Sequence, residues 1–212
     1  MRRRIHHDAS ALRNTLLVST DARSAITYGV DLPTEADLRL CGDVSTKRVV
    51  VLGDAARTPI AFARLGARTI AVDSSGEAVE TGRQAADEAE VRVEFHVGDL
   101  ADLGFITSAS VDLVFSTAAS EADDLSRMVR QANRVLREHG SLVLAVPHPA
   151  RAMTNVASLA KGYWANGHRT LTEYFTTLTR ASFTVDVLLE PEPSGGAMVP
   201  PVLVTRGRKI GT

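Results

Sequence analysis

The stretch Lys47–Ser75 constrains the fold of this chain more than any other part of the sequence. It begins with the apolar, mostly β-branched run Val49–Leu52, which is typical of a strand buried on both faces in a parallel sheet. A second apolar run, Thr69–Val72, follows after a short interval and ends at Asp73. The pattern therefore predicts two neighbouring parallel strands whose carboxyl ends lie at the same edge of a sheet.

A short helix is predicted between these two strands. Thr58 is expected to cap it and Pro59 to occupy its first position, because the first turn leaves the N–H that proline lacks unpaired anyway. Gly66 is expected to end the helix. A strand, a loop at Gly53, a helix and a second strand ending in an acid make half of a mononucleotide-binding unit. In such units the acid, here Asp73, commonly holds ribose hydroxyls.

The composition is that of an ordinary globular protein. The 212 residues are 44% hydrophobic and 23% charged, and the formal net charge is -1, so there is no basic field for nucleic acid. The sequence has no apolar run near the ~20 residues of a membrane span and no apolar signal region after its basic start. The single Cys41 excludes an internal disulfide and a cysteine zinc site, and His6 and His7 have no recognisable ligand partner, so no metal is expected. We therefore expect a cytoplasmic protein that binds neither nucleic acid nor membrane.

Strand and helix patterns alternate through the middle of the chain. Helices are expected over Ser75–Ala89 and over Asp124–Glu138, the second with an amphipathic face and with Gly140 at its end. The further strands expected here are Val91–Phe95, Val111–Phe115 and Leu142–Val146. This alternation predicts an α/β fold with a mostly parallel sheet and helices on both faces.

The last third of the chain predicts an antiparallel end to this sheet. Thr170 and Glu173 form a capping-box pattern at the start of a helix. Strands are expected over Phe183–Leu189 and Val202–Arg206, and the Pro- and Gly-rich connection between them has no room for a crossover helix. We therefore predict a seven-stranded sheet in which only the last strand runs antiparallel to the rest.

Residues 1–45 precede the first core strand and show no core periodicity of their own. Thr34 is expected to cap a short helix that extends to about Leu40. We expect this N-terminal segment to lie across the carboxyl edge of the sheet as a lid. A frayed arm is the alternative.

Four stretches of the sequence together resemble the class I S-adenosylmethionine-dependent methyltransferases, most closely the small-molecule group often called type 11. Their order and spacing carry the resemblance, and they are Arg48–Gly53, Leu65–Ser75, Gly98–Leu100 and Asn133–Leu144. The resemblance implies a Rossmann-like fold with a terminal hairpin, S-adenosylmethionine as cofactor, S-adenosylhomocysteine as product and a small-molecule methyl acceptor. It also implies a single domain with four parts, namely a lid or arm (1–45), a cofactor-binding core (46–149), an acceptor-side segment with a helix (150–182) and a terminal hairpin (183–212).

The resemblance assigns cofactor contacts to the carboxyl ends of the predicted strands. Asp73 would accept both ribose hydroxyls, Asp99 would accept the adenine amino group, and Leu100 would pack on the adenine face. The full implied set is Gly53, Asp54, Ala55, Asp73, Ser74, Gly98, Asp99, Leu100 and Ser116. Ordinary alternatives are a helix-capping acid at Asp73, a turn acid at Asp99 and a loop hydroxyl at Ser116.

His148 is the one candidate for a catalytic residue. It lies between Pro147 and Pro149 at the end of the fifth predicted strand, where an imidazole could take the acceptor's proton near neutral pH. Methyl transfer from a sulfonium depends mainly on alignment, so a structural histidine is the alternative. Tyr28 and Trp164 are candidates for the acceptor pocket, with core packing as the alternative.

The loop after the first strand departs from the family pattern of an acid followed by G-x-G-x-G. The corresponding positions are Val51, Gly53, Ala55 and Arg57, so the acid and two of the glycines are missing. Asp54 could supply the missing negative charge, and Arg57 could pair with the cofactor's carboxylate or fill its place. The alternative function is therefore a methyltransferase-like protein that has lost catalysis and serves as a cofactor-binding or interaction module. A homodimer stays open for either function, and a nicotinamide-dependent oxidoreductase is disfavoured because G-x-G-x-x-G is absent.

Overall fold

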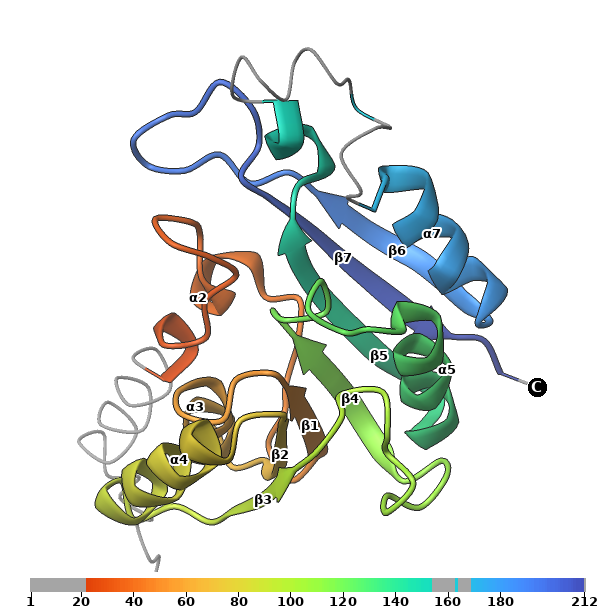
Figure 1. Ribbon diagram of the computed structural model, residues 1–212. Coiled ribbons are helices and arrows are strands. Elements are labelled where there is room, and N and C mark those ends of the chain that lie inside the picture. The colour runs from red at the N-terminus through yellow and green to blue at the C-terminus, as the bar shows by residue number, and fades with distance from the viewer. Residues whose placement is uncertain (1–21, 154–162, 164–168, 212) are drawn as a thin grey trace, which may run out of the picture.

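The computed structural model describes residues 22–153, 163 and 169–211, which build one seven-stranded sheet with helices on both faces (Figure 1). The strands are β1 (Arg48–Leu52), β2 (Arg68–Asp73), β3 (Val93–Val97), β4 (Val111–Ser116), β5 (Leu136–Pro147), β6 (Phe183–Leu189) and β7 (Val202–Lys209). The helices are α2 (Glu35–Leu38), α3 (Thr58–Arg64), α4 (Gly76–Glu88), α5 (Leu125–Val135) and α7 (Leu171–Arg180), with the 3-10 helix η1 (Pro149–Met153).

The strand order is β3-β2-β1-β4-β5-β7-β6. Strands β1 to β5 pair in parallel, whereas β7 runs antiparallel to both of its neighbours, β5 and β6. Residues 190–201, which connect β6 to β7, contain no helix, so these two strands must form a hairpin. The predicted sheet, with its single antiparallel strand near the C-terminus, is confirmed.

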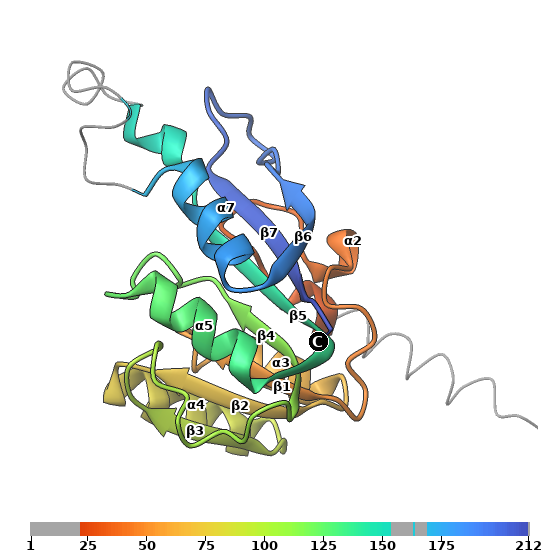
Figure 2. The same cartoon turned by 90° about the vertical axis from the view of Figure 1, so that its right-hand side faces the viewer.

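Apolar side chains from both faces of the sheet form the core. One face packs against α5 and α7, and the other packs against α3, α4 and the N-terminal segment (Figure 2). The run Val49–Leu52 is fully buried, with Val50 and Leu52 in the cluster of the first face and Val49 and Val51 in that of the second. This alternation explains why a central strand reads as one continuous apolar run.

The helix predicted over Asp124–Glu138 is shorter than expected. Asp124 caps α5, since its carboxylate accepts a hydrogen bond from the backbone N–H of Arg127, and the helix ends at Val135. The next residue, Leu136, is fully buried and already pairs with Val111 of β4. Burial of Leu136 in the sheet therefore prevails over the helical preference of the charged residues that follow.

Gly140 does not end a helix, contrary to the prediction. It lies within β5, in a short outward loop between the residues that pair with β4 at Leu136 and Ser141. His139 in this loop has the left-handed φ of 60°, and a Cβ on Gly140 would lie 3.0 Å from the carbonyl oxygen of Arg137. The glycine lets the chain turn back into the sheet, which is a bulge rather than a helix cap.

Strand β3 begins at Val93, two residues later than the predicted Val91. Glu90 has a left-handed φ of 53°, and the N–H of Val91 donates to the carbonyl of Ala86 at 3.1 Å. These are the features of a Schellman-type helix end. Residues up to Val91 therefore terminate α4 instead of extending the strand.

The described part of the N-terminal segment, residues 22–45, packs against the sheet. Ile26, Tyr28, Leu40 and Val44 are buried in the apolar cluster that also contains strand residues of β1, β4 and β5. Thr34 caps α2, as predicted, and Asp37 completes a capping box that was not predicted, although the helix ends at Leu38. The loop between Tyr28 and Thr34 reaches the β6–β7 connection, where the N–H of Ser194 donates to the carbonyl of Asp31 at 3.0 Å.

Two expectations from composition concern membranes and metals. No helix in the described part of the chain is long and apolar enough to cross a membrane. Within the same residues, no group of three or more His, Cys, Asp or Glu side chains is arranged to hold a metal ion. His6, His7 and Trp164 lie outside the described residues.

Candidate functional site

The candidate site lies at the carboxyl edge of the sheet between β1 and β4. From β1 the chain order runs outward through β2 and β3 on one side and through β4 and β5 on the other. The connections therefore diverge at this point, which is where open α/β sheets bind ligands. The loops after β1, β2, β3 and β4 all open at this edge.

Gly53 ends β1 in a conformation that favours glycine. Its φ is +78°, and a Cβ at this position would lie 2.2 Å from the Cβ of Ala118 in the loop after β4. The same Cβ would lie 3.3 Å from Leu100 in the loop after β3. Three loops of the edge therefore meet at Gly53, and only a residue without a side chain fits between them.

Asp54, rather than Thr58, closes the N-terminus of α3. One carboxylate oxygen of Asp54 accepts from the backbone N–H groups of Ala56 (3.2 Å) and Arg57 (3.1 Å), and the other accepts from the N–H of Thr58 (3.2 Å). The Thr58 hydroxyl also donates to Asp54, so Thr58 does not cap the helix as predicted. A carboxylate has about four acceptor sites on its two oxygens, compared with two on a hydroxyl, so it can satisfy all of these donors at once.

Asp73 sits at the end of β2 and is partly exposed. Its Oδ1 accepts from the N–H of Ser75 at 2.9 Å, and its carbonyl accepts from the N–H of Gly98 at 2.9 Å. Ser75, not Asp73, caps α4, through a hydrogen bond from the N–H of Ala78 at 3.2 Å. The bond to Ser75 engages only Oδ1, so Oδ2 is placed to accept a hydrogen bond from a ligand. Ser74 beside it is exposed.

Asp99 and Leu100 lie in the loop after β3, one strand further out. Asp99 Oδ1 accepts from the N–H of Ala101 at 2.8 Å, and its Oδ2 lies 3.6 Å from the guanidinium of Arg127 on α5. The Asp99 side chain is about half exposed, at 52%, so this ion pair is a weak, screened contact. Leu100 is buried beneath Gly53.

Ser116, at the end of β4, is fully buried. Its hydroxyl donates to the carbonyl of Leu52 at 2.9 Å and accepts from the N–H of Ala118 at 3.2 Å. Through these two hydrogen bonds, the Ser116 side chain links the end of β1 to the loop after β4. Its expected contact with a cofactor stays a prediction, and its visible role is to hold the two loops at a fixed separation.

A pocket of about 200 Å³ opens beside these loops, and we call it the edge pocket. It is lined by Thr27, Tyr28, Gly29, Asp54, Thr117, Ala145, Val146, Pro147 and Val202. Tyr28 lines this pocket and is also 2% exposed, with its ring packed against Phe115, and its contact with an acceptor stays a prediction. Thr27, Gly29 and Val202 were not identified from the sequence. Thr27 and Gly29 precede the first core strand, and Val202 begins the antiparallel strand β7, so none of the three follows the carboxyl end of a parallel strand.

His148 has both ring nitrogens engaged. Its Nδ1 accepts from the N–H of Ala150 at 3.1 Å, which places the imidazole proton on Nε2, 2.8 Å from the carboxylate of Glu190. The ring is 9% exposed, and the backbone N–H of His148 donates to the carbonyl of Pro201. This geometry supports the structural alternative, because a general base would have to give up one of these contacts. The catalytic role of His148 stays a prediction.

The positions that lack the family's acid and glycine are both buried. Val51 is 0% exposed, packs in the cluster that holds the N-terminal segment, and does not line the edge pocket. Ala55 is 2% exposed, and its carbonyl oxygen would lie 2.3 Å from a Cβ placed on Gly82 of α4. An acid introduced at Val51 would enter an apolar cluster, so we expect it to destabilise the fold rather than to restore a ligand contact.

Comparisons with known proteins agree with this geometry. Residues 52–144 match the model of a family described as a methyltransferase domain, a span that runs from the end of β1 into β5 and includes the loops after β1, β2, β3 and β4. A comparison with curated protein sequences gave no match.

Solved structures of methyltransferases share the fold. An S-adenosylmethionine-dependent methyltransferase from Mesorhizobium loti is 19% identical, with a TM-score of 0.66 over 81% of this chain and 95% of that one. The complex of the Haloferax volcanii Trm112 methyltransferase activator with a methyltransferase matches at 20% identity and TM-score 0.65, over 99% and 100% of the two chains. Geranyl diphosphate C-methyltransferase from Streptomyces coelicolor A3(2), solved with S-adenosyl-L-homocysteine, matches at 14% and 0.65, over 82% and 73%. At these identities the likeness establishes a common fold.

Proposed function

We propose that the chain is an S-adenosylmethionine-dependent methyltransferase that methylates a small-molecule acceptor, because residues 52–144 match the methyltransferase domain family. One observation carries the proposal beyond the family. The partly exposed carboxylates of Asp73 and Asp99 stand at the ends of adjacent strands, next to a pocket that opens at the ends of β1, β4 and β5. A ligand with a polar nucleoside end and a second, reacting end fits that layout.

The residues present suit the cofactor. Asp73 would accept the ribose hydroxyls, since its hydrogen bond to Ser75 engages only one oxygen. Asp99 would accept the adenine amino group, and Gly98 leaves open space beside it, because a Cβ there would meet nothing within 4 Å. Asp54 would face the ammonium group at the methionine end, where it lines the edge pocket.

The edge pocket supports a small acceptor. Its volume of about 200 Å³ and its apolar wall of Ala145, Val146, Pro147 and Val202 suit a compact, partly apolar molecule. S-adenosylmethionine supplies an electrophilic methyl group on a sulfonium. This chain's part is to align the acceptor atom with the sulfur–methyl bond and to exclude water from it.

One observation favours the alternative of a cofactor-binding or interaction module without catalysis. Asp54 occupies the N–H groups at the start of α3, so this helix end presents a carboxylate instead of free donors to the methionine end of the cofactor. Methyl-labelled S-adenosylmethionine offered with a panel of small alcohols, amines and thiols separates the two functions. We expect a labelled small product. Cofactor binding with no labelled product from any compound would favour the module, and label transferred to protein or nucleic acid would overturn the proposed acceptor class.

Arg57 is proposed to bind the carboxylate of the cofactor. Its backbone N–H is already held by Asp54, and its side chain is exposed at the start of α3. We expect Arg57→Gly to weaken S-adenosylhomocysteine binding about tenfold in calorimetry, the loss of one charge-assisted contact.

Two controls separate the meanings of that result. Arg57→Lys keeps the positive charge and should retain most of the affinity. Adenosine, which lacks the carboxylate, should bind Arg57→Gly and the parent alike. Tighter binding of S-adenosylhomocysteine by Arg57→Gly would show instead that the arginine obstructs the site.

A further inference from the structure

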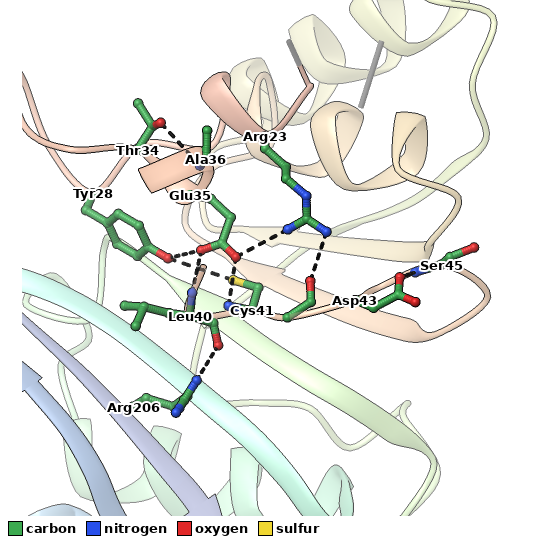
Figure 3. A network of polar contacts seen from close by, with 11 residues as sticks. Arg23, Tyr28, Thr34, Glu35, Ala36, Leu40, Cys41, Asp43, Ser45 and Arg206 are labelled. Atoms are coloured by element: carbon green, nitrogen blue, oxygen red, sulfur yellow. Dashed lines mark hydrogen bonds and ion pairs between the residues drawn. The ribbon is translucent and has the colours of Figure 1, made fainter. Parts of the chain in front are cut away.

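The N-terminal segment contains a carboxylate, that of Glu35, which is fully buried (Figure 3). Glu35 Oε2 accepts hydrogen bonds from the Tyr28 hydroxyl at 2.5 Å and from the N–H of Leu40 at 3.0 Å. Its Oε1 accepts from the N–H of Cys41 at 2.9 Å and lies 3.6 Å from the guanidinium of Arg23. Both oxygens are thus satisfied, as a buried charge requires.

Stability alone does not account for this arrangement. Burying a carboxylate carries a large desolvation penalty, and apolar residues of similar volume often serve a core equally well. The surroundings of Glu35 are otherwise the apolar cluster of Ile26, Leu40 and Val44 with the sheet. What the carboxylate provides, and an apolar side chain would not, are directional contacts to the N–H groups of Leu40 and Cys41 and to the hydroxyl of Tyr28.

Tyr28 connects this carboxylate to the edge pocket. Residues Thr27–Gly29, which we call the pocket cover, all line the pocket. The Tyr28 hydroxyl points to Glu35, while its ring packs on Phe115 of β4 with the ring centroids 5.7 Å apart. Phe115 lies two residues before Thr117, which lines the pocket from the other side.

The cover is held closely at its far end as well. A Cβ on Gly29 would lie 2.8 Å from Leu32 and 3.1 Å from Val202, the first residue of β7. At the near end, Thr27 forms a β-bridge with Thr34, and the N–H of Glu35 donates to the carbonyl of Ile26 at 2.9 Å. A shift of the cover would therefore change the width of the pocket directly.

Glu35, which anchors the cover, is in turn linked to the sheet through Leu40. The guanidinium of Arg206 on β7 donates to the carbonyl of Leu40 at 2.9 Å (Figure 3) and forms a two-pronged pair with Asp186, at 2.9 Å for each contact. Asp186 is the extra residue of a bulge in β6, between Val185 and Val187, which turns its carboxylate toward β7. The chain of contacts thus runs from β6 and β7 through Leu40 and Glu35 to the cover.

The Tyr28 hydroxyl is suited to a permanent role as donor. Burial, with the neighbouring Cys41 and Glu35, raises the pKa of Tyr28 far above its usual value, so the hydroxyl keeps its proton at any physiological pH. Burial likewise raises the pKa of the Cys41 thiol, which keeps that side chain neutral and unreactive. The Tyr28 hydroxyl is therefore the donor in its contact with Glu35.

We propose that Glu35 is a positioning residue of the methyltransferase site, which sets the place of the pocket cover Thr27–Gly29 through the Tyr28 hydroxyl. The proposal rests on the proposed function in one respect, namely that the methionine end of the cofactor meets the acceptor in the edge pocket. Glu35 touches neither cofactor nor acceptor, and it acts only through Tyr28.

The test compares Tyr28→Phe, Glu35→Gln and the double variant with a matched control. Tyr28→Phe keeps the ring and removes only the hydroxyl, and we expect it to weaken S-adenosylhomocysteine binding about three- to tenfold in calorimetry. Glu35→Gln should weaken it at least as much, because an amide must turn a donor toward one of the N–H groups of Leu40 and Cys41. The double variant should bind like Glu35→Gln alone, since both changes cut the same link.

The control is Val44→Ala. Val44 is 1% exposed in the same cluster and does not line the pocket, so this variant should melt at a lower temperature and bind as the parent does. Parental affinity in both Tyr28→Phe and Glu35→Gln would overturn the proposal. So would an equal loss in Val44→Ala, which would make the effect one of general stability.

Amide hydrogen exchange of residues 27–32 in the protein without ligand tests the positioning role of Glu35 separately from the proposed methyltransferase function. Faster exchange in Tyr28→Phe and Glu35→Gln than in Val44→Ala supports the anchor, and equal exchange in all three overturns it. If the parent does not bind S-adenosylhomocysteine at all, the proposed function fails, and the exchange measurement still decides whether Glu35 holds the cover.

Discussion

Replacing Asp73 with alanine should weaken binding of S-adenosylhomocysteine by more than about a hundredfold while the protein stays folded. The expected loss is that of two charge-assisted hydrogen bonds to the ribose, each worth ~1.5–3 kcal/mol. The carboxylate is partly exposed at the end of β2, and its one internal contact is to the N–H of Ser75. Calorimetric titration of the variant and the parent measures the effect.

Two neighbouring variants separate a ligand contact from a local structural effect. Ser75→Ala removes the cap of α4, so it should lower the free energy of unfolding by ~1 kcal/mol and leave the affinity unchanged. Asp73→Asn keeps an acceptor for the N–H of Ser75 but loses the charge, and should give an intermediate affinity. If Asp73→Ala binds as the parent does, Asp73 serves only to shape the turn before α4.

Gly53→Ala should lower the free energy of unfolding by about 2–5 kcal/mol. The left-handed backbone of this residue, at φ +78°, costs roughly 1–2 kcal/mol for any residue with a Cβ, and overpacking adds ~1–3 kcal/mol. The added carbon would lie 2.2 Å from the Cβ of Ala118, so the loops after β1 and β4 would have to separate. Chemical denaturation of the two proteins measures the difference.

The matched control is Gly98→Ala at the other glycine of the site. A Cβ on Gly98 would meet nothing within 4 Å, so this variant should unfold within about 0.5 kcal/mol of the parent. Equal stability of Gly53→Ala and Gly98→Ala would mean that the loop after β4 yields freely, and that Gly53 is not required for the close approach of the two loops.

The central sheet could be predicted because its signals are local. The apolar run Val49–Leu52 and the acid at Asp73 mark two buried strands and the edge at which they end. The lack of a helix between β6 and β7 was equally visible and fixed the one antiparallel strand. Each of these features depends on a short stretch of sequence and on the chain's need to bury it.

The errors arose where contacts distant in sequence decide the structure. The end of α5 is set by the pairing of Leu136 with Val111, which no helical pattern reveals. The start of α3 is set by Asp54, which accepts from the N–H groups of Ala56, Arg57 and Thr58 and also from the Thr58 hydroxyl, so that Thr58 begins the helix instead of capping it. The end of α5 and the start of α3 are both set by contacts that a helical sequence pattern does not reveal.

The candidate site could be predicted only in part, because only some of its residues lie at the ends of predicted strands. Residues at strand ends, such as Asp73 and Asp99, follow from the alternating pattern and the family resemblance. The pocket cover Thr27–Gly29 and its anchor Glu35 do not, because they reach the site across the face of the sheet. The sequence showed Glu35 only as an acid in the first turn of a short helix, which is usually an exposed position.

Titration of the whole chain with S-adenosylhomocysteine in a calorimeter tests the central claim most directly, namely that the carboxyl edge between β1 and β4 binds this cofactor. The account predicts saturable binding at one site per chain, with a Kd of roughly tens of micromolar because the loop after β1 lacks the family's acid and places Asp54 at the helix end. S-adenosylmethionine should compete for the same site. No heat of binding for either compound up to ~1 mM, from a protein shown to be folded, would contradict it.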